Sequence, residues 1–389
     1  MEKERTITIL GSSGSIGVQA LDVIRSKFSD YRVGYLTVNS NIRTLEQQSI
    51  EFNPVGVAIR NENACREFRK KTNFKGIILC GEEGIRQAAA DSGNDLVLSA
   101  LVGFSGVLPT LDAIEAGTDI ALANKETLVS AGGIITESAK NKGVSLIAVD
   151  SEHSAVLQCL VGERIEEVEK IILTASGGPF RNTNASEFER LTAADALKHP
   201  NWNMGSKITI DSATMMNKGF EIIEAYWLFG IGKEKIDVLI HPQSIVHSLV
   251  QFIDGSVKAQ LGLPDMRIPI SYALSYPRRM YYEFPRLKLE DTLSLTFSKP
   301  DYHKFPCLRL AYEALESGGT APASINAANE IAVYSFLDGK IKFTDIPKII
   351  DFTMSKIENT LNPSIDDIIE SDFEARLIAQ EYIYNLITN

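Results

Sequence analysis

The run Thr6-Ile7-Thr8-Ile9-Leu10-Gly11-Ser12-Ser13-Gly14-Ser15-Ile16-Gly17 decides the fold of the first part of this chain. Its apolar start is typical of a buried strand, and the three glycines lead into an amphipathic run over residues 16–27. Glycines here permit a tight turn and close approach of the backbone to a phosphate, which a helix N-terminus also favours. The run therefore predicts a dinucleotide-binding loop. A plain strand-to-helix turn stays as the alternative, because the spacing is G-x-x-G-x-x-G rather than G-x-G-x-x-G.

Short apolar runs alternate with helical patterns on both sides of this loop. A second helical pattern covers residues 109–116, and the strand-like runs are 6–10, 33–38, 55–59, 76–79, 96–99, 120–123 and 145–149. This βαβ alternation predicts a parallel, doubly wound sheet, which binds ligands at the carboxyl ends of its strands. We expect an α/β chain with a Rossmann-like N-terminal domain over residues 1–149.

The pattern of predicted strands, loops and helices changes after residue 149 and again near residue 278. Residues 150–277 predict an α+β catalytic domain with strands at 170–174, 238–240, 245–252 and 256–260, a mobile loop at 177–206 and a dimerisation surface. A connector at 278–301 leads to a helical C-terminal domain, 302–389, with helices at 308–316, 323–338, 343–359 and 373–387.

Composition excludes several classes of function. A net charge of −11 over 389 residues gives no basic footprint for nucleic acid, although a local group of donors can still bind a small phosphorylated substrate. No apolar stretch is long enough to span a membrane. Cys65, Cys80, Cys159 and Cys307 form no C-x-x-C pair, so we expect structural thiols in a reducing compartment. A cytoplasmic enzyme fits best.

The segment after the second strand bears on the choice of cofactor. NAD enzymes usually place an acidic residue there to bind the ribose 2′-hydroxyl, but this chain has Asn39, Ser40 and Asn41, followed by Arg43. These donors suit a 2′-phosphate, so NADPH is favoured over NADH. For Arg43, a solvated loop position is the alternative.

Asp150-Ser151-Glu152 follows the last predicted strand of the first domain. In an extended segment the two carboxylates lie on one face, and such oxygen ligands suit Mg²⁺ or Mn²⁺ better than zinc. Because D-x-E is common, a capping or solvent-facing role is the alternative.

A less common run extends from Asp211 to Glu221. Ser212 resembles a helix cap, with the helix reaching about residue 229. Asn217, Lys218 and Glu221 then share one face, and together they can bind a phosphate or polyol beside a metal. Gly219 in this helix costs about 1 kcal/mol relative to alanine, which indicates close approach of backbone or ligand. An exposed ion pair is the alternative.

Three further segments add polar side chains to this picture. Asn124-Lys125-Glu126 follows a predicted strand, and the turn beginning at Ser176 resembles an anion-binding turn. The loop His199-Pro200-Asn201-Trp202-Asn203-Met204-Gly205 carries an aromatic residue and a histidine that, taken singly, is more typical of a surface.

Taken together, these segments resemble the 1-deoxy-D-xylulose 5-phosphate reductoisomerase family. The likeness covers nearly the whole chain in order, and its matching runs are GSSGSIG, LANKETLV, DSEHSA, SGGPF, HPNWNMGSKITIDSATMMNKGFEIIEA, HPQSIVHS, LGLPDMR and SINAANEIA. The resemblance implies NADPH- and metal-dependent rearrangement and reduction of 1-deoxy-D-xylulose 5-phosphate to 2-C-methyl-D-erythritol 4-phosphate, in non-mevalonate isoprenoid precursor biosynthesis. It also implies a homodimer.

The resemblance assigns roles to individual residues. Asp150, Glu152 and Glu221 would bind Mg²⁺, Mn²⁺ or Co²⁺, with Lys125 and Ser151 near the metal and the substrate. Ser176, Ser212, Asn217 and Lys218 would hold the substrate phosphate, and His199 would close over it while Trp202 and Met204 exclude water. The residues that would contact NADPH are Ser13, Gly14, Ser15, Ile16, Asn39, Ser40, Asn41, Asn124, Glu126 and Gly205.

One departure concerns the cofactor, since many family members have a basic residue where this chain has Asn39-Ser40-Asn41. The preference for NADPH is then weakened or is restored by Arg43. Two other functions compete with this interpretation. A reductase of the aspartate-semialdehyde or homoserine type would need a nucleophilic cysteine or lack the carboxylate motifs, and a regulatory NADP(H) sensor would lack intact metal ligands.

Overall fold

The structure, a computed structural model, describes residues 4–27, 29–202, 204–291 and 294–388. The chain forms two compact units, which we call unit 1 and unit 2. Unit 1 comprises Met1–Thr127, Ile135–Ser154 and Asp265–Phe284, and unit 2 comprises Leu128–Ile134, Ala155–Pro264 and Pro285–Asn389. The domain limits expected at residues 149 and 277 do not coincide with these boundaries, because a late segment belongs to the first unit.

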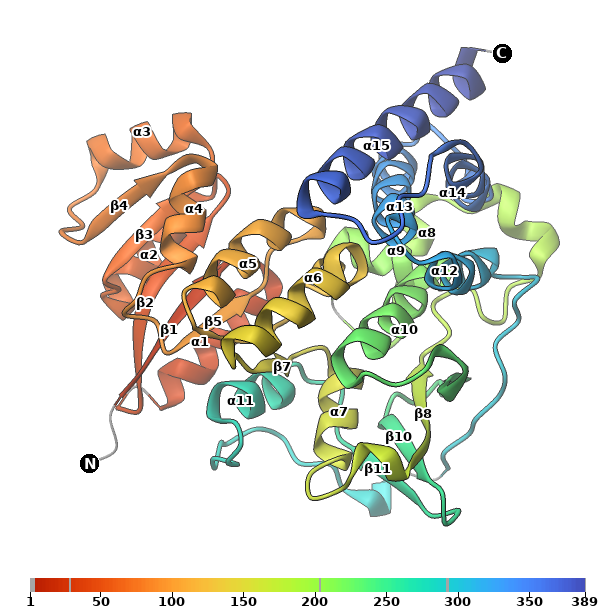
Figure 1. Cartoon of the computed structure of the whole chain (residues 1–389), viewed down its shortest axis with the longest axis horizontal. Coiled ribbons are helices and arrows are strands. Elements are labelled where there is room, and N and C mark those ends of the chain that lie inside the picture. Colours follow the sequence, from red (N-terminus) through yellow and green to blue (C-terminus); the bar gives the residue numbers. More distant parts are fainter. Residues whose placement is uncertain (1–3, 28, 203, 292–293, 389) are drawn as a thin grey trace. The chain divides into compact units, whose positions relative to one another are not determined.

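Unit 1 contains the predicted parallel, doubly wound sheet (Figure 1). Its strand order is β4-β3-β2-β1-β5-β6-β7, so the chain winds outward from β1 to β4 and then crosses to β5 on the other side of β1. The strands are β1 Arg5–Leu10, β2 Tyr31–Val38, β3 Gly56–Ile59, β4 Ile77–Cys80, β5 Leu96–Ser99, β6 Asp119–Leu122 and β7 Leu146–Ala148. The glycine loop follows β1 and therefore lies where the winding direction reverses, which is the ligand-binding position of such sheets.

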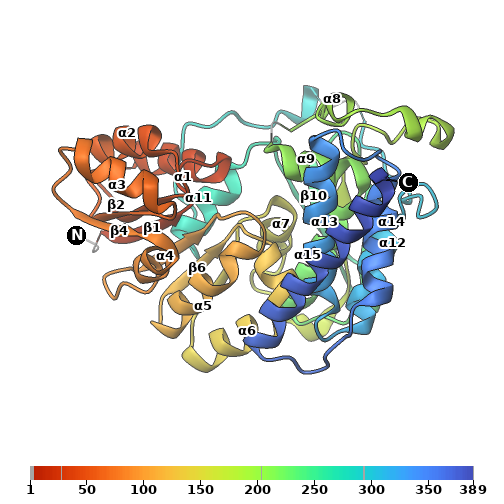
Figure 2. The ribbon, with the colours of Figure 1, turned by 90° about the horizontal axis from the view of Figure 1, so that it is seen from above.

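Helices cover both faces of this sheet, with α1, α2 and α11 on one face and α4 and α5 on the other (Figure 2). Their bounds are α1 Ser15–Ser26, α2 Ile42–Phe52, α3 Glu62–Lys71, α4 Gly81–Ala89, α5 Val107–Glu115 and α11 Arg267–Ser275. Helix α1 buries Ala20, Leu21 and Ile24, while Ile7 and Ile9 of β1 are fully buried. Coverage of both faces explains why these strands read as continuous apolar runs.

Helix α11 explains the mismatch in the domain limits. It packs against α1, it buries Ile270 and Leu274, and Arg5 Nη1 donates a hydrogen bond of 2.9 Å to the Leu274 carbonyl oxygen. Two further helices, α6 Glu126–Lys142 and α7 Ser151–Cys159, each contain residues of both units.

Unit 2 combines a four-stranded sheet with a group of helices. The strand order is β11-β10-β8-β9, with β10 antiparallel to both of its neighbours and β8 parallel to β9. The strands are β8 Val168–Ala175, β9 Ile236–Ile240, β10 Val246–Phe252 and β11 Val257–Leu261. The longer helices are α9 Ser206–Thr214, α10 Met216–Phe229, α12 Pro306–Ser317, α13 Ala321–Leu337, α14 Asp345–Lys356 and α15 Ile365–Thr388; α8 Ala193–Ala196 is a single turn.

One hydrophobic core joins the sheet of unit 2 to its helices. Ile171 and Leu173 of β8, Phe220 of α10 and Ile325 of α13 are all members of it. The helical segment predicted at 302–389 therefore shares its core with the α+β part of unit 2. Among the described residues, every helix is too short or too polar to cross a lipid bilayer.

The cysteines depart from the sequence-based expectation. Cys65 and Cys80 form a disulfide with a Cα–Cα distance of 5.8 Å, so the interpretation of all four as free thiols is wrong for this pair. The reason is topological, because α3, which carries Cys65, packs against β4, which ends at Cys80. Cys159 and Cys307 are buried free thiols, and burial raises their pKa values to about 11 and about 12.

Candidate active site

The glycine loop of unit 1 has the close backbone approach that its sequence predicts. Gly11 has φ of +89°, and a Cβ atom added there would lie 2.6 Å from the Ala100 carbonyl oxygen. A Cβ added at Gly17 would lie 2.4 Å from the Gly11 carbonyl oxygen. The Ser12 hydroxyl points inward and donates to Gln48 Oε1 at 2.8 Å, whereas Gly14 is exposed. The loop is thus fixed from within and open on its outer side.

The residues after β2 are exposed, and one of them has a structural role. Asn41 caps α2, because its Oδ1 accepts a hydrogen bond of 3.2 Å from the Thr44 backbone nitrogen. The Asn39 carbonyl oxygen accepts from the Asn61 nitrogen at 2.9 Å, which holds the end of β2 beside the end of β3. Arg43 lies in the exposed first turn of α2.

Buried polar groups follow β6. Asn124 Nδ2 donates to Glu126 Oε2 at 2.9 Å and to the Gly103 carbonyl oxygen at 3.2 Å. A Cβ at Gly106 would lie 2.2 Å from Asn124 Oδ1, so the amide packs directly on that glycine. Lys125 is 5% exposed, and its ammonium forms an ion pair with Asp150. Unit 1 therefore brings Lys125 and Asp150 together.

The expectation of an extended segment at Asp150–Glu152 is wrong. Helix α7 begins at Ser151, and the Asp150 carbonyl oxygen accepts from the Ser154 nitrogen at 2.8 Å, so Asp150 precedes the first turn. Strand β7 ends at Ala148, and the chain turns into the helix directly after it. The Ser151 hydroxyl donates to the carboxylate of Glu152. The predicted shared face of the two carboxylates depended on an extended backbone, which this segment does not have.

The prediction that one long helix begins at Ser212 is also wrong. Met215 has φ of +65° and separates α9 from α10, so Ser212 lies in the last turn of α9 rather than at an N-cap. A left-handed methionine is rare, because its Cβ approaches the following carbonyl oxygen. Nothing in the sequence marks this break, because the position is occupied by neither glycine nor asparagine.

The predicted face of α10 is confirmed. Asn217 Nδ2 donates to Glu221 Oε1 at 2.6 Å, and the Lys218 ammonium pairs with the other carboxylate oxygen. Lys218 is 3% and Glu221 1% exposed, so this is no surface ion pair. Gly219 has a packing role, because a Cβ there would lie 2.4 Å from the Ala311 Cβ on α12.

The turn after β8 follows Ser176 and packs against the end of α9. Gly177 and Gly178 both have positive φ, +82° and +67°. A Cβ on Gly178 would lie 2.6 Å from the Ser212 carbonyl oxygen, so this turn packs against the end of α9. The Ser176 hydroxyl accepts from the Gly178 nitrogen at 3.2 Å. Unit 2 therefore places the turn that follows Ser176 against the end of α9, which carries Ser212.

His199 is half-buried and hydrogen-bonded through both ring nitrogens. Nδ1 accepts from the backbone nitrogens of Asn201 (3.2 Å) and Trp202 (3.0 Å), and Nε2 lies 3.0 Å from the Ser176 hydroxyl oxygen. Burial and then the charge of Arg181 lower the pKa of His199 below its ordinary value. A neutral ring with its proton on Nε2 satisfies all three contacts. A plain surface histidine is excluded.

Trp202, Met204 and Gly205 complete this loop. Trp202 and Met204 are half-buried, with the indole 6.1 Å from the His247 ring. Gly205 is exposed and precedes α9, where its carbonyl oxygen accepts from Thr209.

Two features of the site escaped sequence reasoning. Arg181 Nη1 donates to the Ser176 carbonyl oxygen at 3.1 Å, but the arginine lies in an unremarkable loop sequence. Asp211 accepts from Lys207 at 2.8 Å and from Asn329 Nδ2 at 2.8 Å, which ties α9 to α13. Buried polar residues in the apolar run SINAANEIA were the available signal for this second contact.

Comparison with known proteins now identifies the family. Models described as 1-deoxy-D-xylulose 5-phosphate reductoisomerase, its C-terminal domain, and DXP reductoisomerase C-terminal domain match residues 7–132, 146–229 and 261–378. The chain belongs to the 1-deoxy-D-xylulose 5-phosphate reductoisomerase family.

Curated reductoisomerases support this membership over nearly full length. The chain is 53% identical to the one from Chloroherpeton thalassium over 98% of both chains, and 52% identical to 1-deoxy-D-xylulose 5-phosphate reductoisomerase 1 from Bacillus thuringiensis subsp. konkukian over 97% of this chain and 98% of the relative.

Solved reductoisomerase structures agree in fold. The Zymomonas mobilis enzyme in complex with NADPH superposes with a TM-score of 0.92 at 42% identity, covering 98% of this chain and 99% of that one. A complex with NADPH, fosmidomycin and magnesium gives a TM-score of 0.93 at 40% identity, with the same coverage. The competing semialdehyde or homoserine type is thereby excluded.

Proposed function

We propose that this chain is an NADPH- and divalent-metal-dependent enzyme that converts 1-deoxy-D-xylulose 5-phosphate into 2-C-methyl-D-erythritol 4-phosphate. The observation that carries the proposal is the contact between Ser176 and His199 within unit 2, in a chain whose family is named for this substrate. The reaction joins a rearrangement of the carbon skeleton to a reduction by hydride.

NADPH would bind along the carboxyl edge of the unit 1 sheet. The outer side of the glycine loop (Ser13, Gly14, Ser15, Ile16), the exposed residues after β2 (Asn39, Ser40, Asn41) and the polar pair after β6 (Asn124, Glu126) follow three strands of that sheet. Parallel strands end at one edge, so these segments suit one extended dinucleotide. We assign Gly205 of unit 2 to the cofactor from the family pattern alone.

The donor set fits a hard divalent cation. Asp150 and Glu152 lie in unit 1 and Glu221 lies in unit 2, and the family pattern assigns all three to one ion. Carboxylate oxygens are ligands that suit Mg²⁺, Mn²⁺ or Co²⁺. A bound divalent ion supplies Lewis acidity toward the substrate's carbonyl and hydroxyl oxygens.

The side chains of unit 2 would bind and orient the substrate. Ser176, Ser212 and Asn217 offer neutral donors for the phosphate group, and Lys218 offers a positive charge. Neutral His199 would donate from Nε2 without adding a second charge. The half-buried Trp202 and Met204 would exclude water, which protects an aldehyde produced by the rearrangement.

In unit 1, Lys125 and Ser151 hold the carboxylates of Asp150 and Glu152 respectively. We propose that both side chains would also contact the substrate beside these carboxylates.

The test follows NADPH absorbance with 1-deoxy-D-xylulose 5-phosphate as substrate, before and after removal of divalent ions by a chelator. We expect oxidation that needs both the substrate and added Mg²⁺ or Mn²⁺. Oxidation that persists in chelator, or no oxidation with fresh substrate and metal, contradicts the proposal.

We further propose that the enzyme is a homodimer. Ile253, Val257 and Leu261 are exposed along the edge strand β11 and the turn before it, and an edge strand invites pairing with a second copy. Light scattering after size exclusion tests the state, and Val257→Lys should shift it toward monomer. A monomeric wild type would contradict it.

A further inference from the structure

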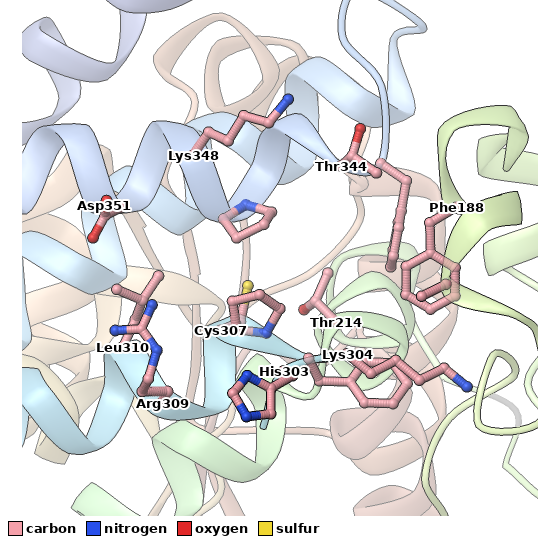
Figure 3. A pocket seen from close by; sticks show the side chains of 15 residues that line it. Phe188, Thr214, His303, Lys304, Cys307, Arg309, Leu310, Thr344, Lys348 and Asp351 are labelled. Carbon is pink, nitrogen blue, oxygen red and sulfur yellow. The ribbon is translucent and has the colours of Figure 1, made fainter. Parts of the chain in front are cut away.

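A cavity of about 380 Å³ lies in unit 2 between α12, α14 and the short 3-10 helix η3 Ala185–Arg190 (Figure 3). Buried Phe188, Phe343 and Leu310 form its apolar wall. Its volume falls within the range of about 300–1,000 Å³ that is typical of small-molecule sites. None of the residues assigned above to cofactor, metal or substrate lines it.

A second, more polar hollow of about 550 Å³ adjoins this cavity. The two share Ala185, His303 and Lys304, and the amides of Asn182 and Asn184 line the second hollow. An apolar space beside a polar one suits a ligand with an apolar body and a polar head.

Most cations around the two spaces are paired with acids: Arg309 pairs with Glu313 and Lys348 with Asp345, whereas the Lys304 ammonium donates to a backbone carbonyl oxygen. Figure 3 shows Lys348, Arg309 and Lys304 around the first cavity, with one acid, Asp351, among its labelled residues. In the second hollow the Asp301 carboxylate already accepts from the backbone nitrogens of His303 and Lys304, each at 3.0 Å. Lys304, which lines both spaces, is therefore the cation that favours an anionic head group there.

Lys304 also connects the cavity to the turn after β8, which carries Ser176 and Arg181. Its ammonium donates to the Arg181 carbonyl oxygen at 2.7 Å, and Arg181 Nη1 donates to the Ser176 carbonyl oxygen at 3.1 Å. The Ser176 hydroxyl in turn contacts His199. An anion that attracts Lys304 competes with the first of these hydrogen bonds.

We propose that the cavity is a binding site for an amphipathic organic anion, with a flat aromatic or alicyclic body against Phe188 and Phe343 and a carboxylate or phosphate at Lys304. Binding there repositions Arg181 and so Ser176, which changes the affinity for the substrate. This coupling rests on the proposed function, whereas the binding itself does not.

The first experiment measures binding of 2-naphthoate to the full-length protein by isothermal titration calorimetry. We expect saturable binding about tenfold tighter than that of neutral 2-naphthalenemethanol, because only the carboxylate pairs with Lys304. The variant Ala185→Trp fills the cavity from an exposed position, and Lys304→Gln removes the cation; each should weaken 2-naphthoate binding about tenfold or more. Lys340→Gln, an exposed lysine elsewhere in unit 2, should leave it unchanged.

Thermal unfolding of Ala185→Trp shows whether the variant is folded. Equal binding by wild type and folded Ala185→Trp, or no saturable binding by wild type, overturns the site.

The second experiment measures KM for 1-deoxy-D-xylulose 5-phosphate with and without 2-naphthoate. We expect KM to change in wild type but not in Ala185→Trp. An unchanged KM despite binding overturns the coupling and keeps the site. Absence of turnover contradicts the proposed function, and the calorimetric result still decides the binding site.

Discussion

Nε2 of His199 lies 3.0 Å from the hydroxyl oxygen of Ser176, while Nδ1 accepts two backbone N–H groups. The two accepted bonds keep Nδ1 unprotonated, so the ring proton resides on Nε2 and points to the serine. The loop that carries His199 and the turn that carries Ser176 are therefore joined through a neutral ring. This contact between His199 and Ser176 lies at the proposed phosphate site.

Replacing Ser176 with alanine should separate the loop from the turn. We expect kcat/KM for the substrate to fall about 10- to 100-fold, since a hydrogen bond to a charged group contributes roughly 1.5–3 kcal/mol. The measurement is steady-state NADPH oxidation. Ser186→Ala, on the exposed surface of η3, serves as the control, and a Ser176→Ala variant with the control's kinetics would contradict the assignment.

The lowered pKa of His199 predicts a pH dependence of stability. The unfolded ring titrates near its ordinary 6.5, and the folded ring titrates below it, so between these values the unfolded chain binds more protons. The contribution of neutral His199 is therefore complete above about pH 6.5 and is lost as the pH falls toward the folded pKa. Urea unfolding of wild type and His199→Gln from pH 5 to 8 measures this. The difference between them should shrink on acidification, and a constant difference would argue against it.

Two glycines of the same loop should respond differently to alanine. At Gly17 the added Cβ would meet backbone atoms at 2.4 Å, whereas at Gly14 the nearest atom would be 3.3 Å away. We expect Gly17→Ala to lower the free energy of unfolding by about 1–3 kcal/mol, as overpacking does, and Gly14→Ala to change it much less. Denaturant titration of both variants decides, and equal stabilities would refute the packing argument.

Glu221 should matter for turnover and little for the cofactor. Glu221→Gln removes one charge from the proposed donor set and from the partner of Lys218. We expect kcat to fall about a hundredfold or more, with the NADPH dissociation constant nearly unchanged in fluorescence titrations. Glu370→Gln, exposed on α15, is the matched control. Wild-type turnover in Glu221→Gln would exclude it as a metal ligand.

Arg43 should set the preference for NADPH. It is the cation nearest in sequence to the segment after β2, where Asn41 already caps α2. We expect Arg43→Ala to reduce the NADPH-to-NADH ratio of kcat/KM about tenfold, because a charged hydrogen bond to the 2′-phosphate is lost. If both cofactors are affected equally, Arg43 does not contact that phosphate.

Sequence patterns predicted the sheet of unit 1 closely. The run 96–99 coincides with β5, and the other strands differ by one or two residues at their ends. These strands are buried on both faces, so most of their residues are apolar and each strand is recognisable in the sequence. The shared face of Asn217, Lys218 and Glu221 on α10 was predicted equally well, because residues three and four apart within one helix are neighbours.

The failures occur where distant packing decides local structure. Met215 takes a left-handed conformation that its side chain does not favour, so no local propensity could place the break between α9 and α10. Cys65 and Cys80 meet only because α3 packs on β4. The return of α11 to unit 1 depends on contacts such as that between Arg5 and Leu274, which lie at opposite ends of the unit's sequence.

The place of α11 has a consequence for synthesis on the ribosome. Nascent domains usually fold in the order in which they emerge, and the seven strands of unit 1 are complete by Ala148. The helix that covers α1 is translated only after Ala155–Pro264. Until then the apolar surface that α11 will bury stays uncovered. Unit 1 of the nascent chain thus stays incomplete while the segment of unit 2 that contains its four-stranded sheet is synthesised. During this interval the nascent chain exposes the most apolar surface to chaperones.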